Sequence, residues 1–219
     1  MYNAKKNAGM VNQNRKEEES TMREEGRLPP GQALTQKFPV LHYGPVPAFN
    51  EKTWDFRITG AVEKPLVLSW AAFNELPRVK KTFDLHCVTR WSKFNTEWEG
   101  VSLSYFIQEG LVKLKPEASH IMQRAEYDFS ANLPLEIALS ERFLLATFFN
   151  GEPLTPEHGA PLRGLVGALP GIRSEKDVYL WKGAKWLRSI EFMTDDRKGF
   201  WEQAGYHNDG KVWEEQRMA

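Results

Sequence analysis

The chain has 219 residues, of which 41% are hydrophobic and 26% are charged, a composition typical of a globular protein with a sizeable core. Lys and Arg total 29 and Asp and Glu total 29, so the zero net charge argues against nucleic acid and against an anionic membrane surface as main partners. The most apolar stretch, 143–149, is too short for a membrane span, and the single cysteine, Cys87, excludes an internal disulfide.

The N-terminal residues 1–27 mix charges densely and hold few apolar positions. They predict a charged arm that is either flexible or an isolated helix. The run Leu28-Pro29-Pro30-Gly31 breaks any helix, so we expect one domain over 28–219. The first residues contain neither an apolar signal core nor a twin-arginine pair, which favours a cytoplasmic protein.

The remainder of the chain predicts many strands and only short helices. We expect strands at 53–59, 80–88, 120–127, 143–149, 179–181 and 186–192, and short helices at 70–76, 103–109 and 135–139. The polar and aromatic stretch 195–219 predicts an irregular tail on the surface. Without a regular βαβ rhythm, the pattern favours an α+β fold, a single β-sheet-rich mixed domain. The absence of GxGxxG and P-loop motifs excludes the usual nucleotide cradles.

Candidate chemistry begins at Cys87, which lies at the end of the predicted strand 80–88. A thiolate at a strand end, with Arg90 three residues further on, has a lowered pKa and binds soft metals. A buried structural cysteine is the alternative interpretation. His86 points to the opposite face of a regular strand, so we do not expect it to be a ligand.

A proline-locked loop at 38–47 presents His42 and Tyr43 and predicts either a recognition surface or a domain-entry loop. Many of the eight tryptophans fall in the second half of the chain. They either line a cavity for a flat ligand or pack in the core. These tryptophans are Trp181, Trp186, Trp201 and Trp213.

A turn at 157–163 brings His158 and Arg163 to either side of a glycine and a proline. Such a turn can bind a phosphate or a polar heterocycle, because Arg makes bidentate contacts with phosphate. An ordinary surface turn is the alternative.

A second candidate is the stretch 181–186, in which Lys182 and Lys185 flank Gly183 and Ala184. The small residues expose backbone N–H groups beside two positive charges, the arrangement of an anion nest. A hairpin turn with solvated lysines explains the same pattern.

Taken in order, these segments resemble the molybdopterin-binding domain of the sulfite oxidase family, in particular its short, single-domain bacterial members. The resemblance runs from about Leu28 to the end of the chain. The blocks that carry it are RLPPGQALT, FPVLHYGPVP, DLHCVTRWSKFNTEWEGV, NLPLE, NGEPLTPEHGAPLR, WKGAKWLRSIEF and DRKGFWEQAGYHNDGKVWEEQR.

The resemblance implies the sulfite oxidase-type fold and a molybdenum-molybdopterin cofactor whose metal is bound by Cys87. One cysteine suffices when the cofactor brings the other ligands. By the same resemblance, the residues that bind, cover or border the cofactor are His42, Tyr43, Ser130, Asn132, His158, Arg163, Lys182, Gly183, Ala184 and Lys185.

The sequence also departs from sulfite oxidases, which hold sulfite with several arginines. Here Leu41 precedes His42, and only Arg90 remains near Cys87, as a candidate catalytic residue. We therefore expect an oxidoreductase that transfers an oxygen atom to or from a small substrate, such as a sulfur compound, and exchanges electrons with an external carrier. The alternatives are a catalytically inactive molybdopterin-binding or assembly protein of the same fold, and a cysteine hydrolase with Cys87 as nucleophile and His158 as base.

Overall fold

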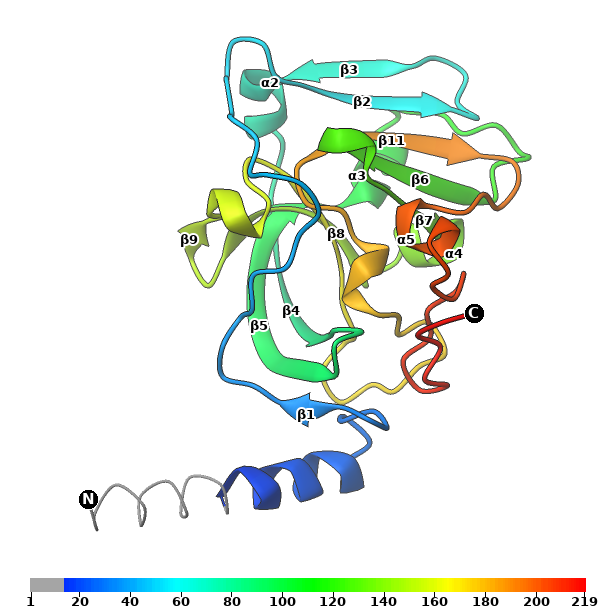
Figure 1. Ribbon diagram of the computed structural model, residues 1–219. Helices are drawn as coiled ribbons and strands as arrows, with labels where there is room; N and C mark the ends of the chain where they lie inside the picture. The colour runs from blue at the N-terminus through cyan, green and yellow to red at the C-terminus, as the bar shows by residue number, and fades with distance from the viewer. Residues whose placement is uncertain (1–13) are drawn as a thin grey trace.

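Two mixed β-sheets organise residues 14–219, the part of the chain that the computed structural model describes (Figure 1). Short helices lie at the edges of the sheets: α2 (Trp70–Asn74), α3 (Leu103–Gln108), α4 (Leu135–Ala138) and α5 (Phe200–Gln203). Three single turns of 3-10 helix, η1 (Glu126–Asp128), η2 (Pro156–His158) and η3 (Leu180–Lys182), join other segments. The predicted α+β class, with mixed sheets and few short helices, is confirmed.

The first sheet is built around the long strand β5, which pairs with β1, β4 and β8. Its β8 strand reads FLLATFF, a continuous apolar run that suits a strand covered on both faces. The pairing of β1 with β5 is parallel and the other pairings are antiparallel. The members of this sheet are β1 (Ala33–Leu34), β4 (Val79–His86), β5 (Trp91–Val101), β8 (Phe143–Phe149), β9 (Glu152–Pro153) and β10 (Arg163–Val166).

The second sheet has the strand order β3-β2-β11-β6-β7. In β2, DFRITG, the alternation turns Phe56 and Ile58 into the main hydrophobic core and leaves Arg57 exposed. That core also receives Phe143 and Leu145 from β8, so it joins the two sheets. The members of this sheet are β2 (Asp55–Gly60), β3 (Leu66–Ser69), β6 (His120–Ala125), β7 (Ser130–Pro134) and β11 (Leu187–Met193).

Two expectations about the second half of the chain are wrong. The apolar run 179–181 is not a strand, because Leu180, Trp181 and Lys182 form η3 and all three side chains are buried. The stretch 195–219 is not simply a surface tail, because it contains α5 and buries Val212 against Tyr179 and Trp181. In both places, a short buried segment lacks the periodicity that separates a turn from a strand.

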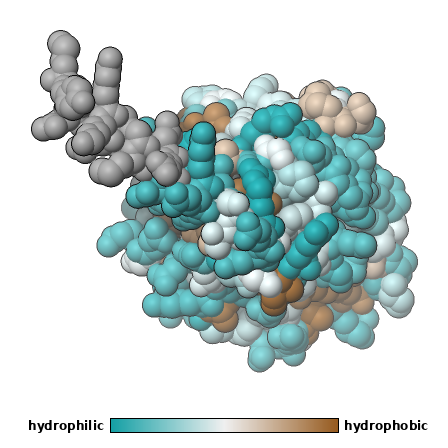
Figure 2. Space-filling view, turned by 90° about the horizontal axis from the view of Figure 1, so that it is seen from below, coloured by the Kyte–Doolittle hydropathy of each residue, from teal (hydrophilic) through white to brown (hydrophobic). Residues whose placement is uncertain are grey.

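The arm before the domain is helical over 14–24 and lies against the first sheet (Figure 1). Arg27 donates to both oxygens of the buried Asp84 carboxylate, at 2.9 to 3.1 Å, and Arg23 donates to the Gln32 carbonyl at 2.7 Å. Viewed from this side, the surface is mainly hydrophilic (Figure 2). The part of the predicted arm at 1–13 lies outside the described residues. Within 14–219, no helix is both long enough and apolar enough to cross a bilayer.

The segment 30–32 and the C-terminal segment around Arg217 meet behind the turn that follows β4. The Gln32 side chain donates to the Cys87 carbonyl at 3.0 Å. From the other end, the Arg217 guanidinium donates to the Tyr179 hydroxyl and, at 3.4 Å, to the Pro30 carbonyl. The segment around Gln32 therefore holds the Cys87 turn, and Arg217, from far along the sequence, contacts that same segment.

Candidate active site

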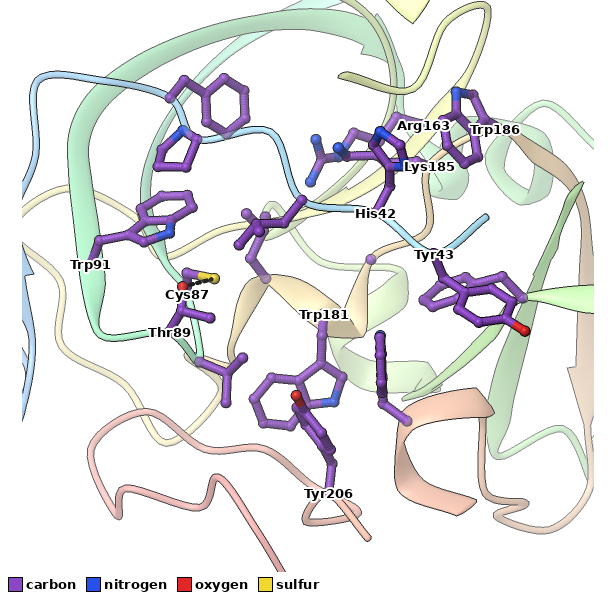
Figure 3. Close-up of a pocket in the computed structure, with 18 residues that line it drawn as sticks. His42, Tyr43, Cys87, Thr89, Trp91, Arg163, Trp181, Lys185, Trp186 and Tyr206 are labelled. Carbon is purple, nitrogen blue, oxygen red and sulfur yellow. Dashed lines mark hydrogen bonds between the residues drawn. The ribbon is translucent and has the colours of Figure 1, made fainter. Parts of the chain in front are cut away.

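A cleft of about 330 Å³ opens where the loop 38–43, the turn after β4, η3 and α5 come together (Figure 3). Cys87 lies at its side, cations lie at one end, and aromatic rings form the other end. The loop 38–43 reaches this place because the Phe38 ring packs against Trp98 and Phe149 of the first sheet, with ring centroids 5.9 and 5.1 Å apart.

Cys87 lies in the tight turn that joins β4 to β5. Its backbone N–H donates to the Trp91 carbonyl at 2.9 Å, and its carbonyl accepts from the Arg90 N–H at 3.1 Å. The Thr89 hydroxyl donates to Cys87 Sγ at 3.2 Å. Because Cys87 is only 8% exposed and borders the cleft, its sulfur is available to a ligand in the cleft and shielded from bulk water.

Two cations, Arg163 and Lys185, face the other side of the cleft. Arg163 donates from one Nη to the His158 carbonyl at 3.2 Å, and its Nε is buried without a partner. Lys185 Nζ donates to the Glu157 carbonyl at 2.7 Å. Among residues 14–219, neither forms an ion pair with a carboxylate. A buried cation without a counter-charge is costly, so this end is suited to an anionic ligand.

The pKa values at this end follow from burial. Burial lowers the pKa of Arg163 to about 10, while the charge of Cys87 acts in the opposite direction. Burial, followed by the charge of Arg163, lowers the pKa of Lys185 to about 7, again opposed by Cys87. The cations and the thiol are thus close enough to affect one another electrostatically.

Aromatic side chains form the opposite end. Trp181 stacks on Tyr179 with centroids 5.0 Å apart and meets Tyr206 edge-on at 5.1 Å, and Trp201 lies 5.1 Å from Tyr206. Trp91 lies above Cys87, and its Nε1 is buried without a hydrogen-bond partner (Figure 3). This end can hold a flat or apolar group.

The structure brings half of the predicted site residues to the cleft and leaves the others behind it or outside it. Those that line the cleft are His42, Tyr43, Cys87, Arg163, Gly183 and Lys185. Those that do not are Arg90, Ser130, Asn132, His158, Lys182 and Ala184.

Lys182 does not face the cleft, although it is three residues from Lys185. Its Nζ donates to Glu202 Oε1 at 2.8 Å, to the Asn208 carbonyl at 2.7 Å and to Asn132 Oδ1. The 3-10 turn η3 directs Lys182 into the interior, and the extended backbone at Gly183 lets Lys185 point the other way. Lys182 and Asn132 therefore support the cleft from behind.

His158 and Ala184 also act from behind the lining. The His158 ring stacks on Phe38 with centroids 4.2 Å apart, and its carbonyl holds Arg163. Burial, followed by the charges of Lys185 and Arg163, lowers the pKa of His158 to about 4. The buried Ala184 donates its N–H to Gln123 Oε1 at 3.1 Å, and Ser130 lies on β7 beyond the lining. No hydrogen bond joins His158 to Cys87 in the described structure, so a hydrolase pair is not formed.

The expectation that Arg90 faces a substrate at Cys87 needs correction. Arg90 has a left-handed backbone (φ 72°), and its guanidinium lies next to Gly31, together with the side chains of Glu215 and Arg217. The tight turn sends this side chain to the back of the hairpin. Sequence spacing alone does not reveal that direction.

Sequence reasoning missed Thr89, Trp91 and Tyr206 as lining residues. Their nearness to Cys87 in the sequence was a signal for the first two. Of the four tryptophans singled out, Trp181, Trp186 and Trp201 line the cleft. Trp213 does not, because its indole donates to the buried Asp177 carboxylate at 2.9 Å.

The side chains around the cleft suit a metal ion that takes one sulfur ligand from the protein and its other ligands from an anionic cofactor. No group of three or more His, Cys, Asp or Glu side chains within 14–219 is placed to hold a metal ion. The cleft offers one soft thiol at its side and two unpaired cations at its end. A soft metal needs such a sulfur ligand, and a phosphate needs such cations.

Comparisons with known proteins point to one family. The model of the oxidoreductase molybdopterin binding domain matches residues 43–201. The chain is 43% identical over 194 residues to the uncharacterized oxidoreductase YuiH of Bacillus subtilis, covering 88% of this chain and 92% of that protein. It is 27% identical over 169 residues to the protein-methionine-sulfoxide reductase catalytic subunit MsrP of Campylobacter jejuni, covering 70% of this chain and 54% of that protein. It is also 27% identical over 219 residues to sulfite oxidase of Arabidopsis thaliana, covering 81% of this chain and 53% of that protein.

The chain thus spans nearly all of the first relative and about half of the other two. Among solved structures, the sulfane dehydrogenase SoxCD of Paracoccus pantotrophus has the same fold, with a TM-score of 0.63 at 24% identity over 78% of this chain and 46% of that one.

Proposed function

Since this chain belongs to the oxidoreductase molybdopterin-binding domain family and is a molybdopterin-dependent oxidoreductase, we propose that it transfers an oxygen atom to or from a small substrate, with Cys87 as the protein ligand of molybdenum. Its cofactor is molybdopterin carrying molybdenum. When bound, this cofactor supplies a metal that exchanges two electrons and one oxygen atom with a substrate.

One observation carries the proposal: a thiol, a buried arginine and a half-buried lysine border the same cleft, and neither cation has a carboxylate partner within 14–219. The proposal assigns the phosphate of the cofactor to Arg163 and Lys185, since their hydrogen-bond partners within 14–219 are backbone carbonyls. Cys87 Sγ supplies the thiolate that such a metal prefers.

Several neighbours fix these groups in place. Thr89 and Gln32 hold the sulfur and the carbonyl of Cys87. At Gly183, a Cβ atom would lie 2.4 Å from the Gly164 carbonyl oxygen, so only glycine lets the backbone pack so closely under the cleft. His42 and Tyr43 cover the cleft from the loop, and His158, Lys182, Asn132, Ala184 and Ser130 support it from behind.

The proposal includes an electron carrier outside residues 28–219, since this part of the chain shows no haem or flavin motif. The domain that does this work covers 28–219, and the preceding arm contributes through Arg27 and Arg23.

The test is metal content. Protein made in a host that synthesises molybdopterin is expected to hold about one molybdenum per chain, as one thiolate site implies. Cys87→Ser is expected to lose the metal. Arg90→Lys, whose side chain lies outside the cleft, is the matched control and keeps it. Elemental analysis that finds no molybdenum in the unaltered protein contradicts the proposal.

A second measurement tests turnover. Metal-loaded protein is assayed with reduced methyl viologen against organic sulfoxides and N-oxides, and with ferricyanide against sulfite. Turnover of any of these supports oxygen-atom transfer. Full metal content without turnover of any of them favours the catalytically inactive binding protein instead.

A further inference from the structure

A buried glutamine from the second sheet contacts the chain segment that leads to Lys185. Gln123 is on β6, and its side chain is fully buried. A buried amide lowers stability unless its donor and its acceptor both find partners. The Gln123 Nε2 donates to the Lys182 carbonyl at 2.6 Å, and its Oε1 accepts from the Ala184 N–H at 3.1 Å. The amide is therefore matched to the two peptide groups on either side of Gly183.

These two hydrogen bonds hold Gly183 in an extended conformation, with φ −114° and ψ 147°. The Gly164 N–H donates to the Ala184 carbonyl at 2.9 Å, so the N–H and the carbonyl of Ala184 are both held. A Cβ atom at Gly164 would lie 2.0 Å from Gln123 Oε1, so glycine leaves the room that the amide needs. The carboxamide thus bonds to the segment as a peptide group of a neighbouring strand would.

The chain after Lys185 is fixed as well. Trp186 has a left-handed backbone (φ 54°), and its indole donates to the Pro156 carbonyl at 2.7 Å. Lys185 lies between these two anchored parts, and its Nζ donates to the Glu157 carbonyl at 2.7 Å. This arrangement directs Lys185 to the end of the cleft that Arg163 also lines, which we call the charged end (Figure 3).

The same amide accounts for the different directions of the two lysines. Lys182 turns inward, where its Nζ lies 2.8 Å from Glu202 Oε1, while Gln123 holds its carbonyl. Lys185 faces the cleft. A rotation at Gly183 would change the direction of Lys185, and it would break both hydrogen bonds of the amide.

We propose that Gln123 is a positioning residue, whose side-chain amide holds the segment 182–184 so that Lys185 faces the cleft. The role rests on the function proposed above, which assigns the phosphate of the cofactor to Lys185 and Arg163. Gln123 does not line the cleft and acts through the segment. It reduces the conformational entropy that the segment loses when an anion binds, and this matters at Gly183, because glycine has the most backbone freedom to lose.

The binding test follows sulfate by NMR titration of the full chain made without the cofactor. Sulfate is expected to bind at Lys185 and Arg163. Gln123→Met keeps the length of the side chain and removes its amide, so the sulfate Kd should rise about tenfold, the effect of ordering one backbone residue on binding. Gln203→Met is the matched control and should leave the Kd unchanged. It removes an exposed amide that donates to the Lys198 carbonyl at 2.9 Å, outside the cleft.

A double-mutant cycle separates positioning from general support of the fold. Lys185→Met removes the cation through which Gln123 acts. The sulfate Kd of Lys185→Met should therefore be the same with and without Gln123→Met, within about a factor of two. An effect of Gln123→Met that has equal size in both backgrounds overturns the proposal, and so does an unaltered Kd in Gln123→Met.

These two results leave the proposed function standing, because sulfate still binds at the charged end. Sulfate that fails to bind the unaltered chain overturns the role of Gln123 together with the assignment of the charged end. Molybdenum missing from the metal-loaded preparation would remove the proposed function itself. The measurements therefore distinguish a failure of the positioning role from a failure of its premise.

Positioning also has a local spectroscopic signature. In Gln123→Met, NMR relaxation is expected to show mobile backbone at Gly183 and Ala184, with order parameters below about 0.6. The strands β6 and β11 are expected to stay rigid, at about 0.85. An unchanged Gly183, or an equal loosening of the whole molecule, contradicts the role.

A measurement on the unaltered protein covers the case in which Gln123→Met does not fold. Sulfate is added while the signals of the Gln123 side-chain amide and of the Ala184 N–H are followed by NMR. Because an anion held by Lys185 restrains the segment, both groups are expected to exchange with solvent about tenfold more slowly. The side-chain amide of Gln203 is the internal reference and should not change. Sulfate binding without a response at Gln123 and Ala184 overturns the proposal.

Discussion

Lys182 and Glu202 form an ion pair that is enclosed under the aromatic end of the cleft. Nζ lies 2.8 Å from Oε1, and the side chains are 1% and 0% exposed. The same Oε1 accepts from the indole of Trp181 at 3.0 Å. Burial lowers the pKa of Lys182, while Glu202 opposes this shift. The pair therefore joins α5 to η3 and sets the position of a cleft wall.

Removing one member of this pair leaves the other as a buried, uncompensated charge. Lys182→Met is expected to lower the free energy of unfolding by about 3–5 kcal/mol, measured by urea denaturation. The double variant Lys182→Met with Glu202→Leu should lose less free energy of unfolding than Lys182→Met alone, because no isolated charge remains. Lys211→Met, which breaks an exposed pair with Glu214, is the control and should cost less than about 1 kcal/mol. Equal losses for Lys182→Met and Lys211→Met contradict the expectation.

We expect Arg163 to lower the stability of the cofactor-free protein while it strengthens the binding of the cofactor. It is buried, and its partner is a carbonyl rather than a carboxylate. Arg163→Met in cofactor-free protein should therefore unfold at equal or higher urea concentration than the unaltered chain. The same variant should retain molybdopterin about tenfold to a hundredfold less well, because a charge-assisted hydrogen bond to phosphate is lost. Normal cofactor content in Arg163→Met would refute the assignment of the charged end.

Lys185 makes anion binding dependent on pH. Burial lowers its pKa to about 7, so in cofactor-free protein it is increasingly neutral above that pH. An anion favours the charged form, so binding takes up a proton in the range from about 7 to the ordinary lysine pKa of about 10.4. Sulfate, whose own charge is constant here, should bind cofactor-free protein more weakly as pH rises from 6 to 9, by up to about tenfold per pH unit above 7. Calorimetry on Lys185→Arg should show a flat profile, and a flat profile for the unaltered protein contradicts the prediction.

Arg27 fastens the segment before the domain to the first sheet. Its guanidinium donates to both carboxylate oxygens of Asp84, a side chain that is 3% exposed, and to Asn95 at 2.8 Å. Burial raises the pKa of Asp84, and the Asn95 N–H and Arg27 oppose the shift. Arg27→Ala should lower the free energy of unfolding by about 3 kcal/mol, since it leaves a buried carboxylate unpaired. Lys113→Ala, which breaks an exposed pair with Glu63, is the control and should have little effect.

The sequence predicted those elements whose pattern is strong and local. The strand 143–149 has the predicted bounds, because an almost entirely apolar run of seven residues is too short for a buried helix and suits a buried strand. The helix after Ser69 begins where its cap predicts, and the Ser69 hydroxyl accepts from the Ala72 N–H. By contrast, the residues of η3 predict a strand, because a short buried run has no periodicity that would distinguish it from a 3-10 turn.

Local patterns single out Cys87, Arg163 and Lys185 before any resemblance is considered, and the structure brings these three residues to one cleft. The spacing of Lys182 and Lys185 did not reveal that one faces Glu202 and the other the cleft, because that depends on where a 3-10 turn ends. Arg90 lies outside the cleft for a similar reason, since its left-handed backbone turns the side chain away.

The packing behind the Cys87 turn has a consequence for the order of folding. The Gln32 side chain reaches the Cys87 carbonyl across 55 positions of the sequence, and Arg217 reaches the Pro30 carbonyl across 187 positions. Closing chain loops of this length costs conformational entropy before the contacts compensate for it. We therefore expect this corner to form together with the rest of the fold and not ahead of it.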